Sequence, residues 1–131
     1  MTAFDAIGIA GTGLTLHRKW LDAVADNMAN SNTVTSTDGA AFQQRYITAR
    51  ADENGQGAYV AGAAYGSEAG RVTFDPDHPL ADAEGYVRMP DIDLGAQMSD
   101  LIMAQRGYQA NAAVVDRAKT AYEAALQIGR S

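Results

Sequence analysis

Residues 94–128 read LGAQMSDLIMAQRGYQANAAVVDRAKTAYEAALQI, and this stretch decides the fold. Apolar residues recur in it every three or four positions, which is the period of an amphipathic helix. They form two adjacent stripes, one through Leu101 and Tyr108 and the other through Asn111 and Val114. A helix of roughly 35 residues is about 50 Å long, and an apolar face of this width contacts more than one neighbouring helix. The sequence therefore predicts one long helix, with Asp91 or Asp93 as its N-cap.

A second helical stripe lies near the N-terminus and ends at the polar run 30–33. Its spacing alternates between three and four, as in a coiled-coil seam, through Phe4, Ile7, Gly11, Leu14, Arg18, Leu21, Ala25 and Met28. We expect this helix to pair antiparallel with the long one. The pair leaves apolar surface uncovered, and an exposed apolar stripe of that length is typical of an assembly surface.

The middle of the chain has a different pattern. Short segments at 41–51, 58–65, 71–74 and 86–89 predict strands. Asn54-Gly55 predicts a type I′ turn between the first two, and 75–79 a stiff loop between the last two. The expected fold class is mainly α with a small β insert: two long antiparallel terminal helices form a coiled-coil-like pair around a short hairpin or irregular region. The predicted boundaries are 1–32 for the N-terminal helix, 33–90 for the insert and 91–131 for the C-terminal helix.

Composition excludes several classes of protein. The 131 residues include 26 alanines but only 23 Leu, Ile, Val and Phe together, so a thick enzyme core is not expected. Residues 51–100 carry two Lys and Arg against ten Asp and Glu, which argues against nucleic acid as a partner. No cysteine is present, so a disulfide or a Cys-based zinc site is excluded.

Targeting and membrane signals are also missing from the pattern. No Lys or Arg precedes Arg18, and glycines interrupt the apolar run 6–16, so a cleaved secretory signal is not expected. This run is too short to cross a bilayer. We therefore do not expect an integral membrane protein.

The candidate functional residues lie on the two helical stripes. Those expected to form helix-pairing or subunit interfaces are Ile7, Leu14, Leu21, Met28, Met98, Leu101, Tyr108, Val115, Tyr122 and Leu126. Asn30 is expected to cap the first helix. Asn111 is expected to set the register, because a polar residue at a seam position costs stability but fixes alignment.

No catalytic, cofactor-binding or metal-binding residue is predicted. His78 lies among Asp75, Asp77 and Asp82, but two prolines stiffen this segment, and a solvated turn explains it better than a metal site. Gly8, Gly11 and Gly13 lack the order and the preceding strand of a dinucleotide-binding loop.

Three segments together resemble a known family. They are Ala25–Thr33 (ADNMANSNT), Pro79–Pro90 (PLADAEGYVRMP), and Tyr108–Asn111 (YQAN) with the helix after it. The sequence resembles the bacterial flagellar axial family of rod, hook and hook-associated proteins, and within it the subunits of the proximal rod. Asp26 and Ala41 depart from the expected pattern.

The resemblance implies a structural subunit without enzymatic activity. Such subunits pack their terminal helices in the inner tube of a helical assembly, which transmits torque and lines the export conduit. The implied partners are other rod proteins, further copies of the chain and the flagellar type III export apparatus. The implied place is the basal body outside the cytoplasm, reached without a cleaved signal.

Two other functions remain open at this point. A coiled-coil adaptor or export chaperone would form a small discrete oligomer, whereas a rod subunit would be a loosely ordered monomer until it polymerises. A small hydrolase or metal enzyme would depend on His78.

Overall fold

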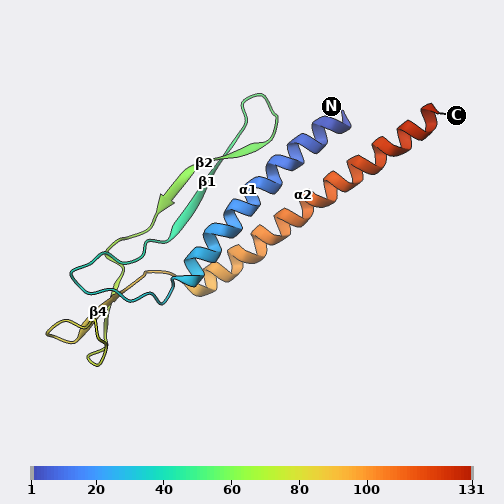
Figure 1. The fold of residues 1–131 in the computed structure, drawn as a ribbon. Coiled ribbons are helices and arrows are strands. Elements are labelled where there is room, and N and C mark those ends of the chain that lie inside the picture. Colours follow the sequence, from blue (N-terminus) through green and yellow to red (C-terminus); the bar gives the residue numbers. More distant parts are fainter. Residues whose placement is uncertain (1, 131) are drawn as a thin grey trace. The chain divides into compact units, whose positions relative to one another are not determined.

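The structure, a computed structural model, describes residues 2–130. The elements follow in the order α1 (Ala3–Ala29), β1 (Arg45–Ala51), β2 (Ala58–Tyr65), β3 (Arg71–Phe74), β4 (Tyr86–Met89) and α2 (Leu94–Gly129) (Figure 1). The strands form two separate two-stranded sheets, β1 with β2 and β3 with β4. The predicted class, mainly α with a small β insert, is confirmed.

The chain divides into two compact units. The first consists of Met1–Leu21, Ile47–Gly62 and Ile102–Ser131, and the second of Asp22–Tyr46 and Ala63–Leu101. Among the described residues, the buried apolar side chains are small: Ala10 and Ala104 in the first unit, and Ala23, Val24, Ala41 and Val87 in the second. The thin core expected from the alanine-rich composition is present.

In the first unit, α1 and α2 run antiparallel (Figure 1). The ring of Phe4 packs edge-on against that of Tyr122, with centroids 4.9 Å apart. Further along α1, Gly13 lies against the side chain of Asn111. Because residue numbers rise on one helix as they fall on the other, the predicted antiparallel pairing is confirmed.

The β1–β2 hairpin of this unit packs on α1 through Thr12. The Thr12 hydroxyl donates to the Ile9 carbonyl (2.7 Å) and accepts from the Ala58 N–H (3.1 Å). Gly57 has φ of 120°, and a Cβ there would overlap this hydroxyl, so only glycine fits without strain.

The expected type I′ turn at Asn54-Gly55 is wrong. A type I′ turn needs positive φ at both central residues, but among the described residues only glycines have positive φ, Gly55 among them. The loop is longer and closes with the Asp52 N–H donating to the Gly57 carbonyl (2.8 Å). The Asp52 carboxylate accepts the Asn54 N–H (3.0 Å), which holds the loop in this form.

In the second unit, β3 and β4 pair antiparallel, with Phe74 opposite Tyr86 and Thr73 opposite Val87. Residues 71–74 and 86–89 form strands with the predicted bounds. The strand expected at 41–51 begins only at Arg45, because the preceding residues make isolated bonds: the Ala41 N–H donates to the Glu68 carbonyl (2.8 Å).

Candidate assembly surface

The interface residues predicted on the helical stripes fall into two groups by exposure. Six are half-buried within the chain: Ile7, Leu14, Leu21, Met28, Leu101 and Val115. The other four are exposed: Met98, Tyr108, Tyr122 and Leu126. Half-buried positions suit helix pairing and exposed positions suit contacts with other subunits. Both roles stay predictions.

The two helices approach each other closely at two glycines in the first unit. A Cβ on Gly107 would overlap the His17 ring, and a Cβ on Gly13 would overlap the Asn111 side chain. His17 Nδ1 lies 2.7 Å from the Gly13 carbonyl oxygen, so the ring has little freedom to move away. The apolar stripes did not predict a close contact at these glycines. Such stripes are recognised from large apolar side chains, and glycine has no side chain to reveal a contact.

A buried polar cluster joins α1 and α2 in the second unit. Asn27 and Gln97 are each only 1% exposed. The Asn27 amide donates to the Gln97 side-chain oxygen (3.0 Å) and to the Arg45 carbonyl (2.9 Å), while the Arg45 N–H donates to Asn27 Oδ1 (2.8 Å). This cluster fixes the end of α1, the start of β1 and the first turn of α2 together. Asn27 lies in the segment Ala25–Thr33 quoted above for the family resemblance, but nothing in the sequence pairs it with Gln97.

The predicted cap and register residues make short-range bonds. Asn30 Nδ2 donates to the Asp26 carbonyl (2.9 Å) where α1 ends. Asn111 Nδ2 donates to the Gly107 carbonyl one turn earlier in α2 (2.8 Å). Their roles as cap and register residues stay predictions. Asp93 is the N-cap of α2, because its carboxylate accepts the Gly95 N–H (2.9 Å).

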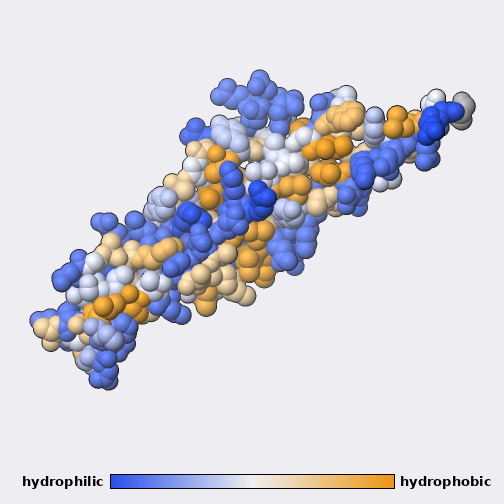
Figure 2. Space-filling model, viewed as in Figure 1, coloured by the Kyte–Doolittle hydropathy of each residue, from blue (hydrophilic) through white to orange (hydrophobic). Residues whose placement is uncertain are grey.

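Apolar side chains remain exposed along α2 within the first unit. Besides the predicted residues, Ile102, Met103 and Val114 each expose 45% of their surface or more. Figure 2 shows hydrophobic atoms at the surface of this helical region, between hydrophilic patches. An exposed apolar face of this length is the feature expected of an assembly surface.

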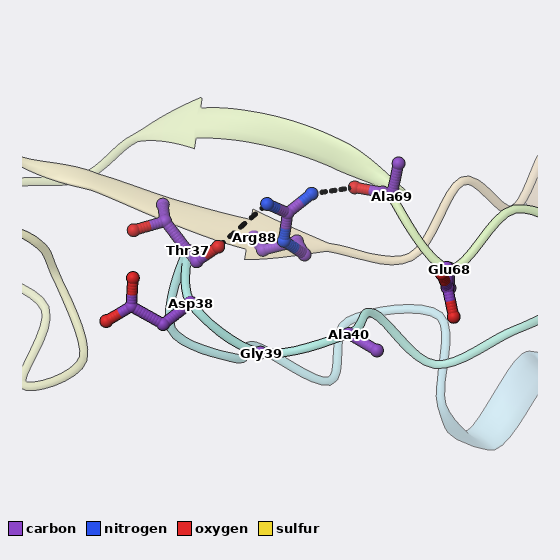
Figure 3. Close-up of a pocket in the computed structure, with 7 residues that line it drawn as sticks. All are labelled: Thr37, Asp38, Gly39, Ala40, Glu68, Ala69 and Arg88. Atoms are coloured by element: carbon purple, nitrogen blue, oxygen red, sulfur yellow. Dashed lines mark hydrogen bonds between the residues drawn. The ribbon is translucent and has the colours of Figure 1, made fainter.

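Arg88 holds together a polar region of the second unit. Its guanidinium donates to the Thr37 carbonyl (2.8 Å) and to the Ala69 carbonyl, beside a cavity of about 380 Å³ that Asp38 and Glu68 also line (Figure 3). Both carbonyl bonds are internal to the unit, so Arg88 ties two loops to β4.

Asp82 organises the loop between β3 and β4. Its carboxylate accepts the N–H groups of Tyr86 (2.8 Å) and Glu84 (3.0 Å) and the Thr37 hydroxyl (2.9 Å). These bonds, the one from Tyr86 first, hold the pKa of Asp82 below its ordinary value of 3.8. The carboxylate is therefore charged at neutral pH.

The histidine in this loop supports the turn. His78 Nδ1 accepts the Leu80 N–H (3.1 Å). Within residues 2–130, no group of three His, Asp or Glu side chains is placed to hold a metal ion. Among the helices described, neither combines the length and apolar character needed to cross a bilayer.

Comparison with known proteins identifies the family. The family described as "Flagellar basal body rod FlgEFG protein C-terminal" matches residues 83–128. The flagellar basal-body rod protein FlgC of Yersinia enterocolitica is 36% identical over 134 residues, which cover 99% of this chain and all of the relative. The chain belongs to the FlgC family.

Other FlgC proteins match over the same extent. FlgC of Salmonella typhimurium is 33% identical, covering 99% of this chain and all of the relative. FlgC of Bacillus subtilis is 27% identical over 150 residues, again covering 99% of this chain and all of the relative. The resemblance to flagellar axial proteins is confirmed, and the two helices and the segment between them all lie within the FlgC alignments.

Proposed function

We propose that this chain is a structural subunit of the flagellar basal-body rod and not an enzyme. It polymerises through α1 and α2 into the tubular shaft that transmits torque and lines the export channel. Residues 1–32 and 91–131 form the helical axial domain, and residues 33–90 form an insert. Its partners are other rod proteins, further copies of itself and the type III export apparatus. The assembled rod lies outside the cytoplasm, and the chain reaches it without a cleaved signal.

One observation carries this proposal: α2 keeps apolar side chains exposed along its length after it has packed on α1 within the first unit. Met103 and Val114 are exposed on one flank of α2, and Leu126 is exposed on the other. Burial of apolar surface contributes about 25 cal/mol per Å², so covering these side chains by neighbouring subunits favours polymerisation. The relatives, which are named as rod proteins, support the same conclusion.

The exposed position Leu126 tests the proposal without disturbing the fold. Leu126 is 49% exposed, so Leu126→Asp should change the stability of the isolated chain by no more than about 0.5 kcal/mol. In the rod, the same change buries an unpaired charge, at a cost of several kcal/mol. We expect loss of swimming and of rods in a strain carrying the variant, and normal motility with the neighbouring control Gln127→Asp. Normal rods in the strain with Leu126→Asp would show that Leu126 does not lie in a subunit interface.

Leu101→Asp probes the half-buried seam in the second unit. It introduces a charge where the side chain is half-buried, which costs several kcal/mol if the charge stays unpaired. We expect failure of rod assembly. Normal assembly would contradict the assignment of Leu101 to the packed seam.

Sedimentation velocity and circular dichroism of the purified chain separate this proposal from the coiled-coil adaptor. A rod subunit sediments as a monomer and gains helicity on polymerisation. A small oligomer that stays folded on dilution would favour the adaptor instead.

A further inference from the structure

We propose that the outer face of the β3–β4 hairpin of one copy docks into the groove between α1 and the β1–β2 hairpin of a second copy. This contact rests on the proposed function and deepens it, because it names two surfaces that meet in the rod. Neither surface is part of the α2 face described above. The inference follows from shape, apolar character and charge on the two units taken separately.

The donor surface is one face of the β3–β4 hairpin in the second unit. Val72, Phe74, Tyr86 and Arg88 share this face, because alternate residues of a strand point the same way, Phe74 lies opposite Tyr86 and Val72 lies opposite Arg88. The Arg88 guanidinium is bound to the Thr37 and Ala69 carbonyls of its own unit. Phe74 is 61% exposed, and its ring meets that of Tyr86 edge-on with centroids 5.3 Å apart. The opposite face holds the buried Val87. The hairpin therefore presents an aromatic pair that its own unit leaves uncovered.

The loop that joins the two strands of this hairpin carries acidic side chains. Asp75, Asp77 and Glu84 are exposed in the loop between the two strands. Within residues 2–130 the ion pairs are Arg45 with Asp26 and Lys119 with Glu123. The three loop carboxylates thus have no cationic partner in the described chain, and a docking partner with positive charge would complement them.

The acceptor surface lies in the first unit, and its groove consists of two separate cavities that share Leu16 in their linings. A cavity of about 230 Å³ is lined by α1 and β1 residues, namely Leu16, His17, Trp20, Ile47 and Ala49. A second cavity of about 240 Å³ includes Thr15, Lys19 and Tyr59 in its lining. Both are small, and their linings offer mainly apolar and aromatic contacts. Such cavities suit single side chains of a protein partner such as Phe74, and they are smaller than a typical small-molecule site.

Positively charged side chains lie near this groove, and their charge is opposite in sign to that of the acidic loop of the hairpin. Arg18 and Lys19 on α1 and Arg50 on β1 are exposed, and none of the three takes part in the ion pairs found in residues 2–130. The first unit as a whole carries seven Lys and Arg against five Asp and Glu, whereas the second carries three against eleven. An acidic hairpin is therefore repelled by the second unit of another copy and attracted to its first unit.

A second copy is the occupant that this complementarity favours, because one chain supplies both halves. Contact between two different surfaces of identical chains is heterologous, and such contacts propagate into open helical assemblies when they do not close into rings. This is the geometry that a rod requires.

Disulfide trapping tests the contact, and the absence of native cysteine makes the result unambiguous. One full-length copy carries Val72→Cys, on the hairpin face beside Phe74. A second copy with a different tag carries Thr15→Cys, at the rim of the groove. The control pairs Val72→Cys with Gln109→Cys, an exposed position on α2. We expect oxidised heterodimer from the first pair and only background from the control, and we expect Phe74→Ser on the Val72→Cys copy to reduce the yield to background.

Several outcomes overturn the contact. Equal yields from the two pairs, or a yield that Phe74→Ser leaves unchanged, contradict it. A further variant carries both Val72→Cys and Thr15→Cys in one chain, and a disulfide that forms only within this chain, with none between copies, contradicts docking between copies. In isolated basal bodies, a Val72→Cys disulfide to a different rod protein contradicts the second copy as occupant.

The same strains separate this inference from the proposed function. If the cysteine variants enter basal bodies normally but no heterodimer forms, only the contact fails. If the wild-type chain is itself missing from basal bodies, the proposed function fails.

Discussion

Substitution of Gly107 by alanine tests how closely the two helices approach in the first unit. In a helix interior, Gly→Ala normally stabilises by about 1 kcal/mol. At Gly107 the added Cβ overlaps the His17 ring, and overpacking of this kind costs about 1–3 kcal/mol. Moving the ring also breaks its contact with the Gly13 carbonyl, worth about 1 kcal/mol. The net expectation is a destabilisation of about 1–3 kcal/mol.

Urea unfolding followed by ellipticity at 222 nm measures this change, with trimethylamine N-oxide present to populate the folded monomer. Gly11→Ala is the matched control, since a Cβ at Gly11 meets nothing within 4 Å, and it should stabilise the chain by about 1 kcal/mol. In a His17→Ala background the overlap disappears, so Gly107→Ala should become stabilising there. If Gly107→Ala raises the unfolding midpoint as Gly11→Ala does, the close approach is refuted.

Two further changes probe the second unit by the same unfolding assay. Asn27→Ala leaves Gln97 and a backbone N–H without their partner, at about 1–3 kcal/mol for each buried group, and an unchanged midpoint would contradict the role of the cluster. Asp82 has a lowered pKa because the folded state, through Tyr86 first, favours its charged form. Its contribution is therefore present above the unfolded pKa and lost as pH falls through the folded pKa. Asp82→Asn should lower the midpoint at pH 7, and the difference from wild type should shrink in acid; a pH-independent difference would contradict this.

The sequence predicted the element order and several boundaries because the signals are local. The strand bounds 58–65, 71–74 and 86–89 agree with the structure, since glycine and proline interrupt the chain around them. Asp93 caps α2 as one of two candidates, because an acidic side chain just before an apolar stripe is a local signal. At Asn54-Gly55 the signal for a turn was correct but its type was not, because Asp52 stabilises a longer loop.

Contacts between distant segments could not be predicted in this way. Asn27 and Gln97 are 70 positions apart, and neither looks like a core residue from its type. Gly13 and Gly107 make room for side chains of the opposing helix, Asn111 and His17. This role becomes visible only when the two helices are placed side by side. Among the predicted interface residues, no sequence pattern separates those half-buried in the chain, such as Val115, from those left exposed, such as Leu126.

Electron microscopy of basal bodies from a strain lacking this gene tests the central claim most directly. If the chain is a structural rod subunit, the isolated basal bodies will have rings without a complete rod, the cells will not swim, and the wild-type gene will restore both. Complete rods in the deletion strain, together with normal swimming, would contradict the proposed function.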